Sequence, residues 1–118
     1  MIRSKYGSKK VVYDEITFDS KMELCFYKLL KEHNIDFTRQ QKFILQPKFK
    51  INGKAVREIS YICDFVCGDD VIDVKGFETT DFKIKKKLFA YKYQKEIILL
   101  KNKKQMIEYI SRKYLNNN

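Results

Sequence analysis

The dipeptide Asn52-Gly53 constrains the fold of this chain more than any other feature. It follows a segment, residues 37–51, in which apolar and polar side chains alternate, and it precedes a second extended segment at 56–67. An Asn-Gly pair favours a type I′ turn, which joins two antiparallel strands. A second turn at Gly68-Asp69 leads into an apolar strand at 71–75. The middle of the chain is therefore predicted to be a three-stranded meander, with Pro47 keeping the first strand at a sheet edge.

Helix signals flank this meander. A short strand is expected at 11–16, and a helix runs from Ser20 to about His33 with an apolar stripe that includes Phe26 and Leu30. After the meander we expect a helix at 79–93, a strand at 96–100 and a helix at 104–115. The order α-β-β-β-α-β-α predicts an α/β protein of the α+β kind, in which helices flank a mixed central sheet.

Length and composition limit the functional classes. The 118 residues suffice for one hydrophobic core, so residues 11–118 are predicted to form one domain after a basic flexible arm at 1–10. No segment suits a membrane span or a signal peptide, which predicts a cytoplasmic protein. The three cysteines form no Cys-x-x-Cys pair, and His33 is the only histidine, so a zinc site is not expected. The absence of a phosphate-binding loop argues against a nucleotide cofactor.

The charge distribution points to a polyanionic partner. The net charge is +10, with an excess of +6 over residues 1–63 and +9 over 82–118, whereas 64–81 carries −5. Such a balance is typical of nucleic-acid-binding proteins, although solvated lysine faces in a lysine-rich protein give the same total. The acidic segment between basic flanks makes the second explanation less satisfactory.

Asp64, Asp73 and Lys75 are the residues that suggest chemistry. If Gly68 and Asp69 form the two-residue loop, Asp64 lies directly opposite Asp73 on the neighbouring strand. Two opposed carboxylates repel unless a cation compensates them, and Mg²⁺ prefers oxygen ligands of this kind. A loop at Asp69-Asp70 would instead place Asp64 opposite Lys75, in an ordinary ion pair.

Glu23 and the helix at 79–93 add further candidates. Glu23 lies in the first turn of the first helix, where it either contributes a metal ligand or completes a capping box with Ser20. Lys85 falls within the apolar arc of its helix, so it either extends outward to solvent or reaches a phosphate at the sheet edge. DNA contacts or surface positions are expected for a wider set: Lys5, Lys9, Lys10, Gln41, Gln46, Lys83, Lys86 and Lys87.

The joint pattern resembles the PD-(D/E)XK nuclease superfamily. Glu23, Asp64 and the run Asp73-Val74-Lys75 match its motif, with Cys63 in place of the proline. More narrowly, nearly the whole chain is similar to small phage and prophage proteins of uncharacterised function. The resemblance implies a restriction-endonuclease-like core, α-β-β-β-α-β. It also implies Mg²⁺ or Mn²⁺ bound by Glu23, Asp64, Asp73 and the Val74 carbonyl, with Lys75 and, less strictly, Lys85 as catalytic lysines.

The expected function is metal-dependent hydrolysis of DNA. Structure-selective cleavage of branched DNA in phage recombination or replication fits a small protein, and similar small resolvases suggest a homodimer. If phage-encoded, the protein would act in the host cytoplasm. Two alternatives stay open at this level: a DNA-binding module of the same fold without catalysis, and a factor that acts on RNA or a protein partner.

Overall fold

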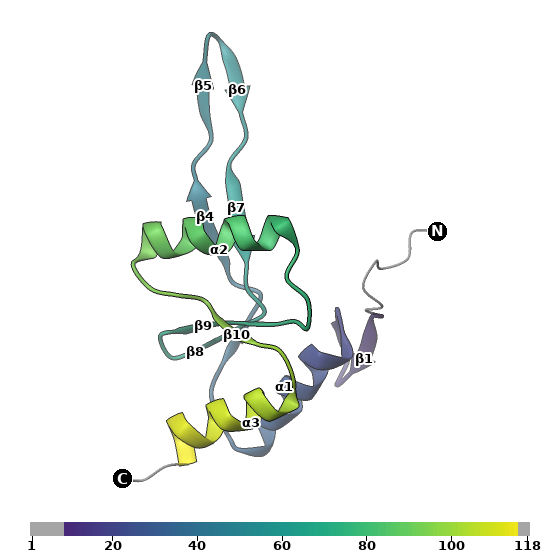
Figure 1. The fold of residues 1–118 in the computed structure, drawn as a ribbon. Coiled ribbons are helices and arrows are strands. Elements are labelled where there is room, and N and C mark those ends of the chain that lie inside the picture. The colour runs from purple at the N-terminus through teal and green to yellow at the C-terminus, as the bar shows by residue number, and fades with distance from the viewer. Residues whose placement is uncertain (1–8, 116–118) are drawn as a thin grey trace. The chain divides into compact units, whose positions relative to one another are not determined.

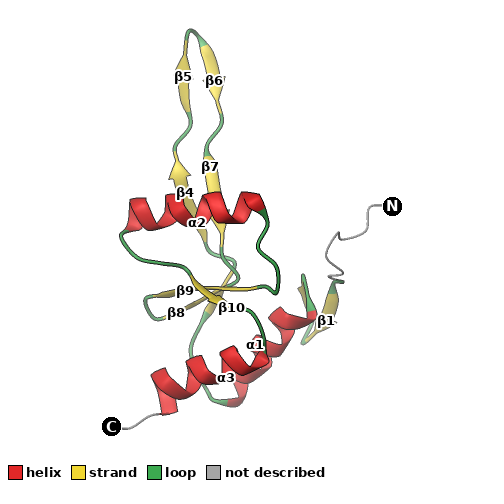
Figure 2. Ribbon diagram, in the orientation of Figure 1, coloured by secondary structure: helices red, strands yellow, loops and turns green. Residues whose placement is uncertain are grey.

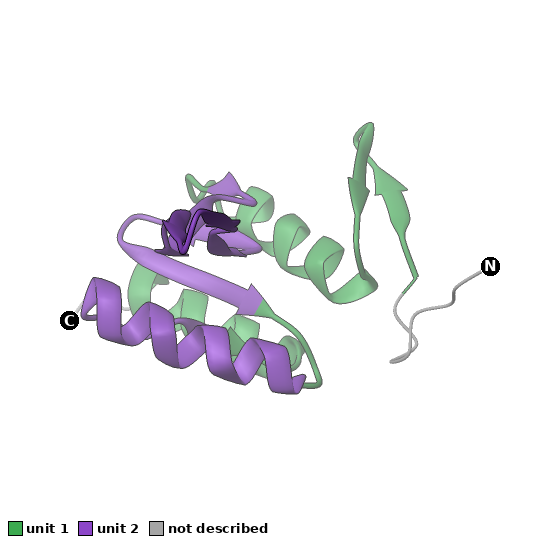
Figure 3. Cartoon of the chain, turned by 90° about the horizontal axis from the view of Figure 1, so that it is seen from above, with its two compact units in different colours: residues 1–37, 74–77, 99–118 green, residues 38–73, 78–98 purple. Residues whose placement is uncertain are grey.

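The structure is a computed structural model and describes residues 9–115. The chain divides into two compact units, coloured separately in Figure 3. Within the described residues, unit 1 holds residues 9–37, 74–77 and 99–115, and unit 2 holds 38–73 and 78–98. Helices and strands are combined in an α+β fold with a mixed sheet and three α-helices (Figure 2), as predicted.

Unit 1 is built around the first helix. The hairpin of β1 (Val11–Tyr13) and β2 (Ile16–Phe18) precedes α1 (Lys21–Glu32), which packs against α3 (Lys103–Ile110). The helix α3 continues as one π-helical segment, η1 (Ser111–Leu115). Aromatic pairs fill this unit, with Phe18 against Tyr27 and Phe26 against Tyr109. As predicted, α1 begins after Ser20 and ends at His33.

Unit 2 contains a long antiparallel ribbon. Its strands are β3 (Thr38–Arg39), β4 (Lys42–Gln46) and β5 (Phe49–Ile51) on the outward path, and β6 (Lys54–Val56), β7 (Ile59–Ile62) and β8 (Phe65–Cys67) on the return. The outermost pair, β5 and β6, extends beyond β4, β7 and α2 (Figure 1). Asn52 and Gly53 form the tip with φ of 51° and 76°, which confirms the type I′ turn.

The helix α2 (Thr80–Tyr93) covers the β4–β7 part of this ribbon. Phe82 and Phe89 are buried against Phe43 and Tyr61. The hydroxyl of Tyr93 and the ammonium of Lys92 donate to the Ile44 carbonyl, which fixes the end of the helix to β4. This aromatic cluster is one part of the buried core of unit 2.

The meander ends in the sheet that positions the candidate site. Its strand order is β10 (Ile98–Leu100), β9 (Asp70–Val74), β8 and β3. Strands β8 and β9 pair as Phe65–Ile72, Val66–Val71 and Cys67–Asp70, around a Gly68-Asp69 turn in which Gly68 has φ 59°. The predicted register is therefore confirmed, and the alternative loop at Asp69-Asp70 is excluded.

Three expectations about the elements need correction. Residues 11–16 do not form one strand, because Asp14 and Glu15 both take positive φ and reverse the chain there. The helical spacing of residues 79–93 also predicts that Ile84, Leu88 and Tyr91 lie along one side of the buried arc, yet all three are exposed. The reason is that α2 crosses only a narrow ribbon, which covers one stripe of the helix. The return strand is interrupted twice, between β6 and β7 and between β7 and β8.

No helix among residues 9–115 has the length and apolarity needed to cross a membrane.

Candidate functional site

Asp73 is a buried carboxylate within the central strand β9. Only 2% of its surface is exposed, and its neighbours Ile72 and Val74 are buried apolar residues. A carboxylate removed from water needs hydrogen-bond donors or a cation to offset its lost hydration. One donor is the backbone N–H of Asp64, which lies 3.1 Å from Oδ1 of Asp73. Main-chain geometry therefore holds this side chain in a defined position.

Asp64 stands opposite Asp73 across the ribbon. The β8–β9 register, continued by one residue beyond Phe65–Ile72, pairs these two positions. Asp64 is half-buried and lies at the interruption between β7 and β8, where its carbonyl accepts from the N–H of Gln40. The register therefore places Asp64 and Asp73 at opposed positions in unit 2, as the turn chemistry predicts.

The side chains of Tyr61 and Cys63, which lie near the two acidic residues, have raised pKa values. Burial, reinforced by the charge of Asp73, raises the pKa of the Tyr61 hydroxyl well above its ordinary value. Burial also raises the pKa of the Cys63 thiol to about 11, and the charges of Asp73 and Asp64 act in the same direction. Both groups therefore stay neutral at pH 7. Burial is the larger cause of both pKa shifts, and the smaller part that comes from the charges of Asp73 and Asp64 is the part that favours a cation.

Glu23 and Lys75 both belong to unit 1. Glu23 is 5% exposed, and its N–H donates to the Ser20 hydroxyl at 3.1 Å, so the backbone half of the capping box is formed. Lys75 follows β9, and its N–H donates to the Leu100 carbonyl at 3.1 Å. A Cβ built on the next residue, Gly76, would lie 3.8 Å from the sulfur of Met22, in the first turn of α1.

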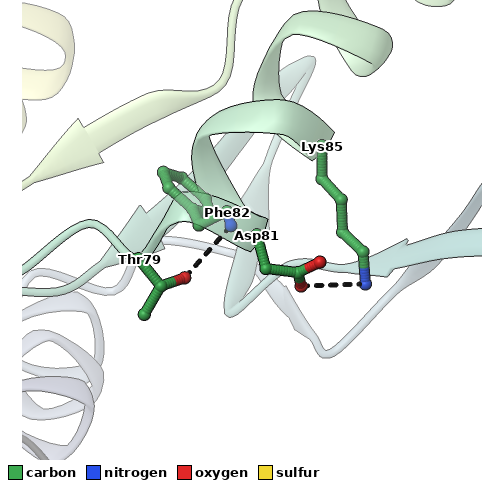
Figure 4. Close-up of polar contacts among 4 residues, drawn as sticks. All are labelled: Thr79, Asp81, Phe82 and Lys85. Atoms are coloured by element: carbon green, nitrogen blue, oxygen red, sulfur yellow. Dashed lines mark hydrogen bonds and ion pairs between the residues drawn. The ribbon is translucent and has the colours of Figure 1, made fainter.

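Lys85 forms an ion pair within its own helix. Its ammonium lies 3.5 Å from the carboxylate of Asp81, one turn earlier on α2, as Figure 4 shows beside the Thr79 cap. Asp81 is largely exposed, so this pair is screened by solvent and holds Lys85 only weakly. Lys85 itself is half-buried, and it lies in the first half of α2, within unit 2.

The predicted DNA-contacting residues have varied surroundings. Lys83, Lys86 and Lys87 line a surface groove of about 320 Å³ on α2, together with Glu78 and Glu96. Gln46 uses its amide within the ribbon, donating to the carbonyls of Pro47 and Arg57. The remaining positions divide simply: Gln41, Lys9 and Lys10 are exposed, and Lys5 lies outside the described residues.

Comparison with protein families gives one match. A family profile with the description "Protein of unknown function (DUF1064)" covers residues 3–110. The chain belongs to the DUF1064 family. Comparisons with curated proteins and with solved structures found no match.

Two features of this DUF1064 chain were not predicted from its sequence. Tyr61 lies beside the Asp73 carboxylate, and its position was readable from the alternation of Tyr61, Cys63, Phe65 and Cys67 on one buried face. The basic tip of the long ribbon was also missed, although no acidic residue occurs between Asp36 and Glu58. Within residues 9–115, no group of three or more His, Cys, Asp or Glu side chains is arranged to hold a metal ion.

Proposed function

We propose that this DUF1064 protein is a metal-dependent endonuclease that hydrolyses phosphodiester bonds in DNA, and that it is related to the PD-(D/E)XK superfamily. The observation that carries the proposal is the buried Asp73, positioned by the Asp64 N–H and opposed by a second carboxylate. A protein that needed only stability would gain by replacing such a pair with apolar residues. Retaining it costs stability, which is common at functional sites.

The donor set suits Mg²⁺ or Mn²⁺. Asp64 and Asp73 provide the hard oxygen ligands that these ions prefer, and the Val74 carbonyl and Glu23 are the further ligands expected from the sequence pattern. A bound ion would supply charge neutralisation at the phosphate and a more acidic water molecule. In this proposal Asp73 positions the ion, and Lys75 orients the attacking water and offsets charge on the scissile phosphate.

The basic surface supports DNA as the substrate. Lys83 and Lys87 are exposed on α2, and Lys86 shares their groove while pairing with Glu78 at 3.8 Å. Phosphate contacts of this kind position a duplex without reading its sequence. Selectivity for branched DNA, action as a homodimer and a cytoplasmic location, in the host cell if phage-encoded, complete the proposal.

The test is a cleavage assay with supercoiled plasmid and a four-way junction in Mg²⁺ or Mn²⁺. Asp73→Asn should lower the cleavage rate at least about 100-fold while DNA binding in EDTA is retained. The matched control is Asp69→Asn, an exposed acid in the turn of the same hairpin, which should cleave as the parent does. Equal rates for Asp73→Asn and parent, or no cleavage of any DNA by a folded parent, would refute the proposal.

Lys75 and Lys85 are distinguished in the same assay. Lys75→Gln should reduce cleavage about as strongly as Asp73→Asn, because it removes the charge beside the reacting phosphate. Lys85→Gln should have a smaller effect, since this lysine is already paired with Asp81. A larger loss for Lys85→Gln than for Lys75→Gln would reverse the two assignments.

A further inference from the structure

The tip of the ribbon in unit 2 is an exposed, purely basic arm. We define the arm as residues 47–57, which comprise β5, the Asn52-Gly53 turn and β6. Every residue in it except Val56 is exposed. It carries Lys48, Lys50, Lys54 and Arg57 and no acidic residue. None of these four side chains forms an ion pair with an acid between residues 9 and 115.

The arm is held firmly at its base. Gln46 donates to the Arg57 carbonyl across the ribbon at 3.1 Å, and Lys42 pairs with Glu58 at 2.7 Å. On the other side of this base, Tyr93 of α2 donates to the Ile44 carbonyl at 3.0 Å. The six residues from Gln46 to the tip extend about 20 Å at the usual rise of a strand. An arm with a fixed base and an uncovered tip is built to reach a partner.

The side chains of the arm include apolar as well as basic groups. Phe49 and Ile51 are 45% and 56% exposed, and they share one face of the arm because they are two residues apart on β5. Lys54 is paired with Ile51 and belongs to the same face, whereas Lys50 belongs to the opposite one. Large apolar groups interleaved with lysines suit a surface that contacts both the phosphates and the edges of the bases of a nucleic acid.

We propose that this arm enters the major groove of duplex DNA. This proposal rests on the proposed function, which makes DNA the ligand. It adds an element that binds the duplex outside the cleavage site. The charge favours DNA over a second copy of the chain, because two such arms would repel each other. A two-stranded ribbon fits the major groove of B-DNA, about 12 Å wide, and not the minor groove of about 6 Å or the narrow major groove of duplex RNA.

The experiment measures binding to a DNA duplex in EDTA, by fluorescence anisotropy across a salt series. A triple variant of the arm, Lys48→Gln with Lys50→Gln and Lys54→Gln, should bind at least about tenfold more weakly and lower the salt slope by about 2 to 3. The matched control changes three exposed cations of unit 1, Lys103→Gln, Lys104→Gln and Arg112→Gln, and should lose much less affinity. Equal losses in the two triple variants would overturn the proposal.

Three further measurements sharpen the assignment. Phe49→Ser with Ile51→Ser should weaken binding without changing the salt slope, because these residues carry no charge. Methyl green, a major-groove ligand, should compete with the protein, whereas competition by netropsin alone would overturn the groove assignment. Duplex RNA of the same sequence should compete poorly, and equal competition would overturn the choice of DNA.

Light scattering of the triple arm variant and the parent tests the remaining alternative. A lower molecular mass for the variant, with the same DNA affinity as the parent, would show that the arm joins two copies of the chain and would also overturn the proposal. Because binding is measured without divalent ions, failure of the arm is separable from failure of the nuclease. A protein that never cleaves DNA can still show the arm effect, and an active nuclease can lack it.

Discussion

Unit 2 contains two hairpins that both reverse through a two-residue turn but differ in burial and charge. Both reverse through two residues with a glycine at positive φ, Gly68 between β8 and β9 and Gly53 between β5 and β6. The β8–β9 hairpin is largely buried, and at its end the Asp64 N–H donates to the buried Asp73 carboxylate. The β5–β6 hairpin is exposed and carries only basic charges.

The difference shows that turn chemistry fixes the connection between strands, whereas burial and charge determine their use. In the buried hairpin the surrounding strands constrain each side chain, which suits a site that must hold an ion in a defined geometry. In the exposed hairpin the side chains remain available to a large partner such as a nucleic acid. We therefore propose that the β8–β9 hairpin carries the metal site and that the β5–β6 hairpin contacts DNA.

The largest expected difference concerns an equivalent aromatic residue in each hairpin. Phe65 of β8 is fully buried and Phe49 of β5 is 45% exposed. Phe65→Ala should lower the free energy of unfolding by about 3–5 kcal/mol, because it leaves a cavity. Phe49→Ala should change it by no more than about 0.5 kcal/mol. Urea unfolding of both variants tests this, and similar losses would mean that the arm packs against the rest of the protein.

A smaller effect is expected from the titration of the buried region at alkaline pH. The pKa of the Cys63 thiol is raised from 9.0 to about 11, so above pH 9 the unfolded chain releases this proton while the folded chain keeps it. The free energy of unfolding should therefore fall between pH 9 and 11, by on the order of 2 kcal/mol. Tyr61 adds to the fall above its ordinary pKa.

The control for this pH effect is Cys63→Ala. Denaturant unfolding at pH 8, 9, 10 and 11 should show a shallower fall for this variant than for the parent. Parallel curves for the two proteins would contradict the assignment of the effect to Cys63.

The smallest expected effect separates the two turns. Alanine at positive φ costs about 1–2 kcal/mol, so Gly68→Ala should reduce global stability by that amount. At Gly53 no atom lies within 4 Å of the added Cβ, and the arm can fray without unfolding the rest. Gly53→Ala should therefore accelerate hydrogen exchange in β6 and leave the unfolding midpoint unchanged. A lower midpoint for Gly53→Ala would show that the arm folds cooperatively with the core.

Local rules made part of this structure predictable. Asn52-Gly53 and Gly68-Asp69 specify their turns because glycine takes positive φ without strain, and the second turn alone fixed the Asp64–Asp73 pairing. Ser20 predicted the start of α1 because serine is a preferred N-cap residue, and its side-chain oxygen accepts a hydrogen bond from the Glu23 N–H.

Other features depend on tertiary surroundings and leave little trace in the sequence. The Asp14-Glu15 turn was missed because Asp takes positive φ far less often than glycine does, and Glu does so only rarely. The covered side of α2 depends on how much of the ribbon lies beneath it, so the exposure of Ile84 could not be read from periodicity. The environment of Asp73 depends on Tyr61 and Cys63, which come from another strand segment.

Manganese binding tests the central assignment most directly. Electron paramagnetic resonance of free Mn²⁺ measures how much of the ion the folded protein removes from solution. We expect saturable binding by the parent and by Asp69→Asn, and loss of that binding in Asp73→Asn. Binding that is equal in all three proteins, or absent from the parent, would contradict the assignment of the Asp64–Asp73 pair as a metal site.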